Sequence, residues 1–469
     1  MGSYARRMMK RRDALKTIGG LGAAAGMARF LPGCGGGSDG PTGITTYVYM
    51  MMENRSYDHF FGARKMMESL PGDGLQSSMF NLDLDGKSVP PWPAGKDTLC
   101  DLDPPHGWED GRAQFNGGLN DGFLQVHQTQ QHGSRTAIEP MQFLMRDDVP
   151  VSWKLADHYA TADRWFCAVM GPTWPNRFYW HAASSEGKMA NTLPGQDGGP
   201  RLLTEPSIYH RLDAKGVDWA YYFGNYNLVS FYQGLDSSKI RRFSDFLAEA
   251  KAGTLPPVVY IDPAFDENDD HPPVHPIHGQ ELISTVYAAL ASSPQWKNCM
   301  LVITYDEHGG FFDHVPPPKT VDQRADQGFD QLGFRVPTLV AGPYVKQGYV
   351  SSKTYEHCSA LRELEVAFDL EPLNQRTMAA NDLSDFIDAD RLARGDWAKP
   401  IELPVVNPED LAQWPMGGNC PARVARETHP IVAWASTQPE LAGIDRKAEA
   451  AEYRRTIREF LADYTARRK

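Results

Sequence analysis

The sequence predicts an α/β fold in which a mostly parallel sheet is sandwiched between helices. Short apolar, β-branched runs recur at the length of buried strands, and helical patterns lie between several of them. This alternation is typical of parallel sheets covered on both faces. Polar motifs directly follow some of the runs, where open α/β sheets bind ligands. The expected strands are 44–52, 165–170, 217–223, 257–261, 301–305 and 337–341, and the expected helices include 152–163, 279–292 and 359–368.

The first 33 residues have the composition of an export signal. Residues 10–16 (KRRDALK) are close to a twin-arginine motif, and the weakly apolar stretch 17–31 is too short to span a bilayer. We expect residues 1–33 to be a signal peptide read by the twin-arginine translocase, which predicts a periplasmic or extracellular protein. LPGC at 31–34 resembles a lipobox, with Cys34 as a lipid-bearing membrane tether; cleavage without lipid attachment is the alternative.

The rest of the chain divides by composition. Residues 34–43 are a Gly-rich flexible tether, and residues 44–400 carry the strand patterns of one large body. Within this body, residues 63–150 predict a loop-rich insertion over one end of the sheet, because they are rich in Gly, Pro, Asp and Gln. Residues 401–469 form a C-terminal extension without strand signals, which ends in a charged helix over 445–468.

Charge and cysteine usage exclude some classes of function. The formal net charge is −12, and removal of residues 1–33, with seven Lys/Arg and one Asp, makes it −18. So acidic a protein has no bulk attraction to nucleic acid or anionic membranes, and a bound phosphate group needs a local cation. None of the six cysteines forms a CxxC pair, which argues against a structural zinc site. Cys167 and Cys299 lie in apolar runs typical of core thiols.

Oxygen ligands for a cation follow two of the expected strands. Glu53 and Asn54 follow the first strand, and Asp306 and Glu307 follow the run that ends at Tyr305. Carboxylate and amide oxygens suit Ca²⁺, Mg²⁺ or Mn²⁺. Each motif alone is a weak signal, because a polar loop after a strand is the default.

Thr173 and several histidines add possible reactive groups. Thr173 lies between prolines in GPTWPNR (171–177), a rigid turn whose hydroxyl needs a base or a metal to react. The chain has no GxSxG elbow, which favours the metal. In 266–278 (DENDDHPPVHPIH) the prolines argue against a helix, so we expect His271 to matter and the other two histidines to be solvated. His106, in PPHGW, is a lone loop histidine, a type that is more often solvated than functional.

Taken together, these motifs resemble a known family. ENRSYDHFFG (53–62), PHGW followed by GLNDGF (118–123), GPTWPNR, DHPP (270–273) and YDEHGGFFDHVPPP (305–318) occur in this order. They are similar to the motifs of the phospholipase C/acid phosphatase family of bacterial phosphoesterases, a branch of the alkaline phosphatase superfamily. The resemblance spans about 45–345 and makes residues 44–400 the expected phosphoesterase catalytic domain, with an alkaline phosphatase-like fold.

The resemblance implies metal-assisted hydrolysis of a phosphate ester through a phosphorylated hydroxyl. It makes Thr173 the nucleophile, and His106 and His271 contacts of the transferring phosphoryl group, one of which protonates the leaving oxygen. Asn176 would orient a phosphoryl oxygen. The divalent metal, whose identity stays open among Ca²⁺, Mg²⁺/Mn²⁺, Zn²⁺ and Fe, would be bound by Glu53, Asn54, Thr173, Asp306 and Glu307.

Several alternatives stay open on the sequence. The substrate is either a phospholipid, as for a phospholipase C, or a soluble phosphomonoester, as for an acid phosphatase. Phospholipases C of the family often carry C-terminal β domains, whereas the region beyond 400 has no strand signals. The aromatic run 219–226 (WAYYFGNY) could line a choline-type cation site, but a buried strand is preferred. A sulfatase would need Cys or Ser at Thr173, and a non-enzymatic binding lipoprotein would leave the ordered motifs unexplained.

Overall fold

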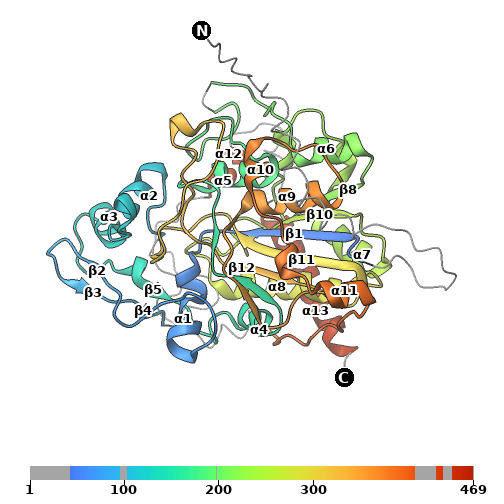
Figure 1. The fold of residues 1–469 in the computed structure, drawn as a ribbon, viewed down its shortest axis with the longest axis horizontal. Helices are drawn as coiled ribbons and strands as arrows, with labels where there is room; N and C mark the ends of the chain where they lie inside the picture. Colours follow the sequence, from blue (N-terminus) through green and yellow to red (C-terminus); the bar gives the residue numbers. More distant parts are fainter. Residues whose placement is uncertain (1–42, 96–102, 197, 407–428, 437–445, 468–469) are drawn as a thin grey trace, which may run out of the picture.

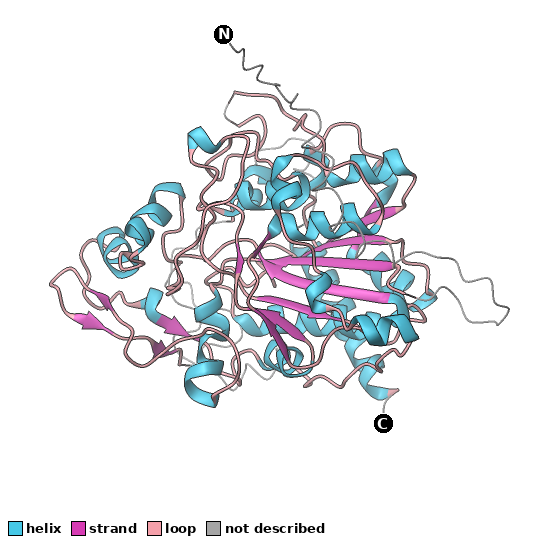
Figure 2. Cartoon of the chain, viewed as in Figure 1, coloured by secondary structure: helices cyan, strands magenta, loops and turns pink. Residues whose placement is uncertain are grey.

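The computed structural model describes residues 43–95, 103–196, 198–406, 429–436 and 446–467, and is built around an eight-stranded sheet (Figures 1 and 2). The order of its strands is β13-β6-β12-β11-β1-β10-β8-β9, which places β1 near the middle. The bounds of these strands are β1 Thr46–Met52, β6 Ala160–Ala162, β8 Trp219–Phe223, β9 Ile240–Arg242, β10 Val258–Asp262, β11 Cys299–Tyr305, β12 Thr338–Ala341 and β13 Tyr349–Ser351.

The sheet is mostly parallel, as predicted. Strands β11, β1, β10, β8 and β9 all run in the same direction, whereas β12 is antiparallel to both of its neighbours, β11 and β6. The carboxyl ends of five parallel strands therefore meet at one edge, the place where open α/β sheets bind their ligands.

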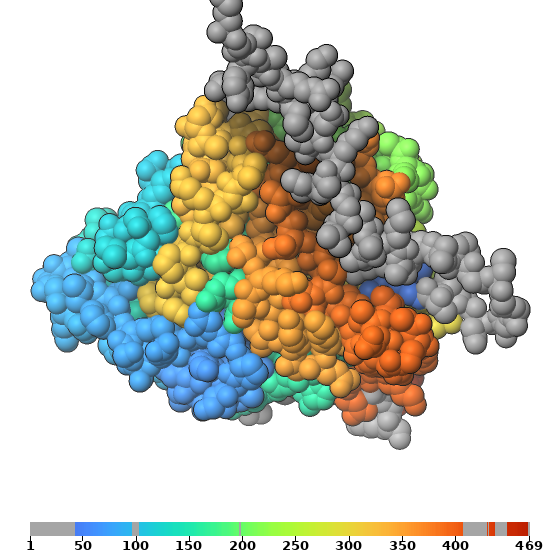
Figure 3. Space-filling view, viewed as in Figure 1, coloured from blue at the N-terminus to red at the C-terminus, as the bar shows by residue number. Residues whose placement is uncertain are grey.

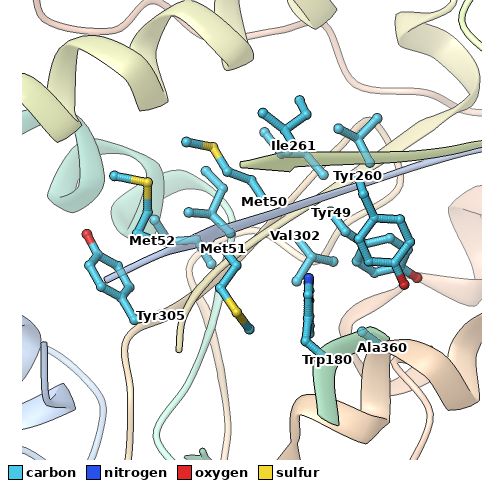
Figure 4. Packing of buried hydrophobic residues seen from close by; sticks show 14 of the residues in the cluster. Tyr49, Met50, Met51, Met52, Trp180, Tyr260, Ile261, Val302, Tyr305 and Ala360 are labelled. Atoms are coloured by element: carbon cyan, nitrogen blue, oxygen red, sulfur yellow. The ribbon is translucent and has the colours of Figure 1, made fainter. Parts of the chain in front are cut away.

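Helices cover both faces of the sheet. Figure 4 shows Met51 on the same side as Trp180 and Ala360, and Met50 on the opposite side with Ile261. Strand β1 is buried along its whole length, as expected for a strand covered on both faces. The helices form one group of α5 Thr173–Ala182, α6 Ile208–Lys215, α9 His357–Ala367 and α10 Gln375–Ala379, and a second group of α4 Pro150–His158, α7 Phe243–Ala252, α8 Pro276–Ala291 and α13 Arg446–Ala466.

Most of the predicted elements are confirmed, and two need correction. The helix expected over 152–163 ends at His158, because residues 160–162 form β6 and pair with β12 and β13. The strand expected over 165–170 is only β7 Trp165–Phe166, which pairs with β14 Tyr355–Glu356 outside the main sheet. The aromatic run beginning at Trp219 is the buried strand β8, as preferred over a cation site.

A loop-rich lobe follows β1, as expected for residues 63–150. Figure 3 shows it in blue and cyan at one side of the molecule. Long loops connect its short elements, several of which are strands of two residues. Its elements are α1 Tyr57–Glu68, β2 Asn81–Leu82, β3 Ser88–Val89, β4 Trp92–Pro93, α2 Trp108–Phe115, α3 Phe123–Gln130 and β5 Gln142–Phe143.

The C-terminal extension packs onto the body. After α11 Ala389–Arg394, the described elements are α12 Pro430–Ser436 and α13, which matches the charged helix predicted over 445–468. Helix α13 packs on α7 and α8. Ile431 of α12 and Ile457 of α13 belong to the same buried cluster as the sheet.

Some predictions fall outside the described residues. The signal peptide, the lipobox and all but the last residue of the tether lie within residues 1–42. In the part of the chain that the structure describes, no helix is both long and apolar enough to cross a membrane. Cys167 and Cys299 are buried free thiols, as predicted.

Candidate active site

The carboxyl ends of β1 and β11 bring together two motifs that lie far apart in the sequence. Met52 pairs with Tyr305 in parallel register, so the next residues, Glu53 and Asp306, leave the sheet side by side. The Asp306 N–H donates to the Met52 carbonyl (3.0 Å), and the Asn54 N–H donates to Asp306 Oδ1 (3.0 Å). Backbone pairing thus fixes the relative position of the two acidic motifs.

The turn after β1 depends on Asn54 and Gly309. Asn54 has a φ of +56°, in the left-handed region that asparagine enters more readily than most residues. Gly309 has a φ of +62°, and a Cβ at this position would lie 2.3 Å from the Asn54 carbonyl oxygen. Glycine therefore allows the second motif to pack directly onto the first.

A buried guanidinium holds the acidic groups. Arg177 Nη2 lies 2.7 Å from Glu53 Oε1, and Nη1 lies 3.0 Å from Asp262 Oδ1; its Nε is 3.5 Å from Asp306 Oδ2. Burial raises the pKa of Glu53 while Arg177 lowers it, and the net result is a pKa of about 7. Burial also raises the pKa of Asp306 well above its ordinary value. One guanidinium thus offsets only part of the negative charge.

Thr173 is the first residue of α5, so the expected rigid turn is the start of a helix. Pro172 is its N-cap and Pro175 lies in the first turn, where proline is tolerated because the N–H groups there have no intrahelical partner. Thr173 is fully buried, and its Oγ1 donates to Glu53 Oε2 over 3.5 Å. A helix N-terminus favours bound anions, so Thr173 lies at a suitable place for a phosphoryl group.

The structure gives Asn176 a different task from the one expected. Its Oδ1 accepts from the Val169 N–H (2.9 Å), and its Nδ2 donates to the carbonyls of Gly171 (2.9 Å) and Pro172 (3.1 Å). Both amide hydrogens are therefore used by the loop that precedes Thr173. We correct the phosphate-binding prediction: Asn176 shapes the loop that precedes Thr173.

His106 and Glu307 face each other across the site. His106 Nε2 lies 3.5 Å from Glu307 Oε1 and 3.3 Å from Asn54 Nδ2, while Nδ1 bonds the Pro104 carbonyl at 2.7 Å. Burial lowers the pKa of His106, but Glu307 and Asp103 raise it more, to about 10. The lone loop histidine is therefore part of the site.

His271 lies beside His106. Their ring centroids are 6.0 Å apart, and His271 Nδ1 bonds the Pro272 carbonyl at 2.6 Å, which leaves Nε2 facing Asp103 Oδ2 at 3.8 Å. Asp103, His106 and His271 each offer one atom that could coordinate a metal ion, and these three atoms all lie within 4.8 Å of one another.

Two predictions for this segment were wrong: its prolines do not prevent a helix, and His275 is not solvated. His275 is buried and N-caps α8, with its side chain accepting from the Ile277 N–H, and His278 lies inside the first turn of that helix. A proline at the first helical position starts this helix instead of preventing it.

The C-terminal extension contributes a histidine that sequence reasoning missed. His429 immediately precedes α12, is buried, and places Nε2 3.1 Å from Glu53 Oε2. Its ring stacks on Phe265 at 4.6 Å and meets His271 and Trp174 edge-on, both at 5.5 Å. Because Nδ1 accepts from the Ile431 N–H, the tautomer with hydrogen on Nε2 donates to Glu53.

Comparisons with known proteins identify the family of the chain. The family model described as "Phosphoesterase family" matches residues 44–371. The chain belongs to the phosphoesterase family. Non-specific phospholipase C6 of Arabidopsis thaliana is 31% identical over 409 residues, which cover 78% of this chain and 76% of that protein. Phospholipase C A of Mycobacterium tuberculosis is 30% identical over 435 residues, with 77% and 81% covered. This phosphoesterase is therefore a phosphoric ester hydrolase, and both of these relatives are named phospholipases C.

Solved structures were compared as well. A protein in the alkaline phosphatase superfamily from Vibrio parahaemolyticus matches with a TM-score of 0.33 and 11% sequence identity, over 50% of this chain and 64% of that chain. A likeness of this extent carries no argument about the site, and the assignment to the family rests on the sequence matches.

The phosphoesterase has oxygen atoms that fit a bound cation. Asn54 Oδ1, Asp306 Oδ2 and Glu307 Oε1 are buried and accept no hydrogen bond from the described residues. Buried polar atoms normally have partners, and these three are hard donors of the kind that divalent cations prefer. Glu53 and Thr173 complete the set of oxygen donors that the resemblance implies. The residues present therefore fit a divalent metal.

Proposed function

We propose that this phosphoesterase is a metal-dependent phospholipase C that works through a phosphothreonine at Thr173. The observation that carries the proposal is the position of Thr173 Oγ1. It lies at the N-terminus of α5 and 3.5 Å from Glu53, and the residues next to Glu53, Asn54 and Asp306, have buried oxygen atoms that accept no hydrogen bond from the described residues.

Each residue of the site has a task in the proposed reaction. A bound divalent cation would lower the pKa of the Thr173 hydroxyl and offset the charge of the arriving phosphate. Glu53 accepts the hydroxyl hydrogen bond, which aims Oγ1 into the site. The Trp174 N–H already donates to Asn191 Oδ1 and Pro175 has no N–H, so the start of α5 would favour a phosphoryl group through the Thr173 N–H and the helix dipole. Attack by Thr173 would break the bond to the leaving oxygen, and water would then hydrolyse the phosphothreonine.

His106 and His271 are proposed to flank the phosphoryl group. Each ring uses Nδ1 on a backbone carbonyl, which fixes its orientation. Nε2 is thereby turned toward the other site residues, Glu307 and Asn54 for His106 and Asp103 for His271. One of the two would protonate the leaving oxygen. His429 and Arg177 are proposed as positioning residues, because both contact Glu53.

The names of the curated relatives favour a phospholipid substrate. They include phospholipases C from a plant and from a mycobacterium, which together with the shared motifs supports hydrolysis of a phospholipid headgroup ester. Acid phosphatase activity on soluble monoesters is the second candidate, because the same groups would act on any accessible phosphate ester. Export by the twin-arginine route, with a possible lipid anchor at Cys34, belongs to the same proposal and rests on residues 1–34 of the sequence.

The test pairs two variants of the nucleophile with two substrates. Thr173→Ala should lose activity on phosphatidylcholine and on a chromogenic phosphate ester, whereas Thr173→Ser should retain part of it, since serine keeps the hydroxyl. Mass spectrometry of acid-quenched wild type should find the phosphate on the peptide that contains Thr173. Chelation should abolish turnover, and a divalent cation should restore it. Full activity of Thr173→Ala after exhaustive chelation would overturn the mechanism, and activity on monoesters alone would select the acid phosphatase.

A further inference from the structure

The segment 80–84 of the loop-rich lobe has an inverted alternation of polar and apolar side chains. Phe80, Leu82 and Leu84 are 52%, 38% and 39% exposed, whereas Asn81 and Asp83 between them are 1% and 6% exposed. A strand at a protein surface normally buries its apolar side and exposes its polar side. Here the polar side faces inward, so the apolar side chains face outward as a set.

Hydrogen bonds hold the segment in this orientation. Asn81 Nδ2 donates to the Asn120 carbonyl (3.3 Å), and Asn81 Oδ1 accepts from the Leu124 N–H (3.5 Å). Asp83 Oδ1 accepts from the N–H groups of residues 85 (2.9 Å) and 87 (2.8 Å), which closes the turn toward β3. Turning the strand over would bury the leucines but break these bonds.

The same lobe carries a fourth exposed apolar side chain. Leu119 is 69% exposed and directly precedes Asn120, the residue whose carbonyl receives the bond from Asn81. We call Phe80, Leu82, Leu84 and Leu119 the apolar rim. Contiguous apolar side chains that remain exposed mark interaction surfaces more often than isolated ones do.

The lobe that carries the apolar rim is bonded directly to the active site. Asn120 Nδ2 donates to the carbonyl of Asp313, in the motif after β11 (2.9 Å). Gln114 of α2 joins the Pro105 carbonyl (2.6 Å), next to the site histidine, to His308 Nε2 (2.7 Å). The rim and the site therefore belong to one hydrogen-bonded unit.

The charges near the apolar rim indicate which kind of surface can bind to it. Asp85 is paired with Arg135 at 2.7 Å, whereas Asp121 accepts only from the neutral Asn116 amide at 2.8 Å and keeps its negative charge. The chain as a whole carries a net charge of −12, which opposes binding to an anionic surface. A surface with an apolar interior and no net charge would accept the exposed apolar side chains and would not be repelled by the acidic chain.

We propose that the apolar rim inserts into the interface of a zwitterionic phospholipid bilayer and holds the active site at the headgroups. This inference rests on the proposed function, because a phospholipase must reach a substrate packed in a membrane. Amphipathic surfaces bind such interfaces by burying apolar side chains at the boundary of headgroups and acyl chains. The rim makes no contribution to the hydrolysis of a small soluble ester.

The test compares two double variants of the full chain on phosphatidylcholine vesicles. Phe80→Ser/Leu119→Ser changes the rim, and Met378→Ser/Val405→Ser changes two side chains of similar exposure (64% and 76%) outside the lobe. Vesicle flotation and vesicle hydrolysis should fall by about tenfold or more for the rim variant, because two inserted apolar side chains are lost. They should stay within about twofold for the control variant, and both variants should hydrolyse the chromogenic ester at the wild-type rate.

Separate readouts distinguish failure of this inference from failure of the proposed function. Flotation is also measured with Thr173→Ala, because binding does not require turnover. Flotation that is equal for the rim variant and wild type would overturn the inference, even if both enzymes are active. Rim-dependent flotation in a protein that hydrolyses neither substrate would uphold the docking surface and overturn the phosphoesterase mechanism. A rim variant that changes only the solution mass in light scattering would assign the rim to contacts between copies and overturn membrane docking.

Discussion

Replacement of Glu53 by glutamine should stabilise the chelated enzyme at alkaline pH. Glu53 is fully buried, and burial raises its pKa from 4.5 to about 7 although Arg177 lowers it. The folded protein thus holds the Glu53 proton more tightly than the unfolded chain does. Its contribution to stability is present below pH 4.5 and is lost as the pH rises through about 7. A shift of this size corresponds to roughly 3 kcal/mol.

Glu53→Gln is nearly isosteric with protonated Glu53 and never becomes charged. In the presence of chelator, the variant should match wild type near pH 4.5 and exceed its free energy of unfolding by up to roughly 3 kcal/mol near pH 8. A saturating divalent cation should reverse the order at pH 8, because glutamine is a poorer ligand than a carboxylate and wild type gains more from binding. The assay is denaturant unfolding at both pH values, with chelator and with metal.

Asp313→Asn is the matched control. Burial raises the pKa of Asp313 to about 6, although its partner Arg335 lowers it, and Asp313 is not a proposed ligand. This variant should show the same direction of pH effect in chelator but no change of order with metal. Equal destabilisation of the chelated enzyme by Glu53→Gln at pH 4.5 and at pH 8 would contradict this prediction. Burial would then not be what raises the pKa of Glu53.

Three other changes test how the site is held. Gly309→Ala would place a Cβ 2.3 Å from the Asn54 carbonyl oxygen at a φ of +62°, so calorimetric titration should show metal affinity reduced by about tenfold or more. His429→Ala removes the 3.1 Å bond to Glu53 and should weaken metal binding to a similar extent, while His429→Gln, which still offers an N–H donor, should recover part of it. Arg177→Met should lower the free energy of unfolding of the chelated enzyme by about 3–5 kcal/mol at pH 8, measured in denaturant, because buried carboxylates lose their cation.

The sheet and the acidic half of the site could be predicted because they depend on local patterns. An apolar run followed by Glu53-Asn54, and another followed by Asp306-Glu307, can be recognised in the sequence as two strand ends. A parallel sheet brings such ends to one edge, and the register of Met52 with Tyr305 does so here. By contrast, the sequence predicts residues 160–162, which form β6, as the end of a helix. A strand of three residues is too short for its apolar pattern to indicate pairing with β12.

The positioning residues could not be predicted from local patterns. His429 lies 376 positions from Glu53, next to a region without strand signals, and only tertiary packing places it at the site. Arg177 did offer a signal. It is four residues after Thr173, so a helix starting at the threonine would put both side chains on one face. The two prolines predict a turn instead, and a turn hides this spacing.

The surplus of carboxylates decides how a phosphate ester can enter the site. Within the described residues, Arg177 is the guanidinium that contacts Glu53, Asp262 and Asp306, and Glu307 adds a further buried acid opposite His106. Without a bound cation, this arrangement disfavours an anionic substrate, and the raised pKa values of Glu53 and Asp306 express the same cost of burying charge. In the proposed mechanism, a divalent cation would offset both the repulsion of the substrate and the cost of burying the carboxylates. Metal binding would then precede substrate binding.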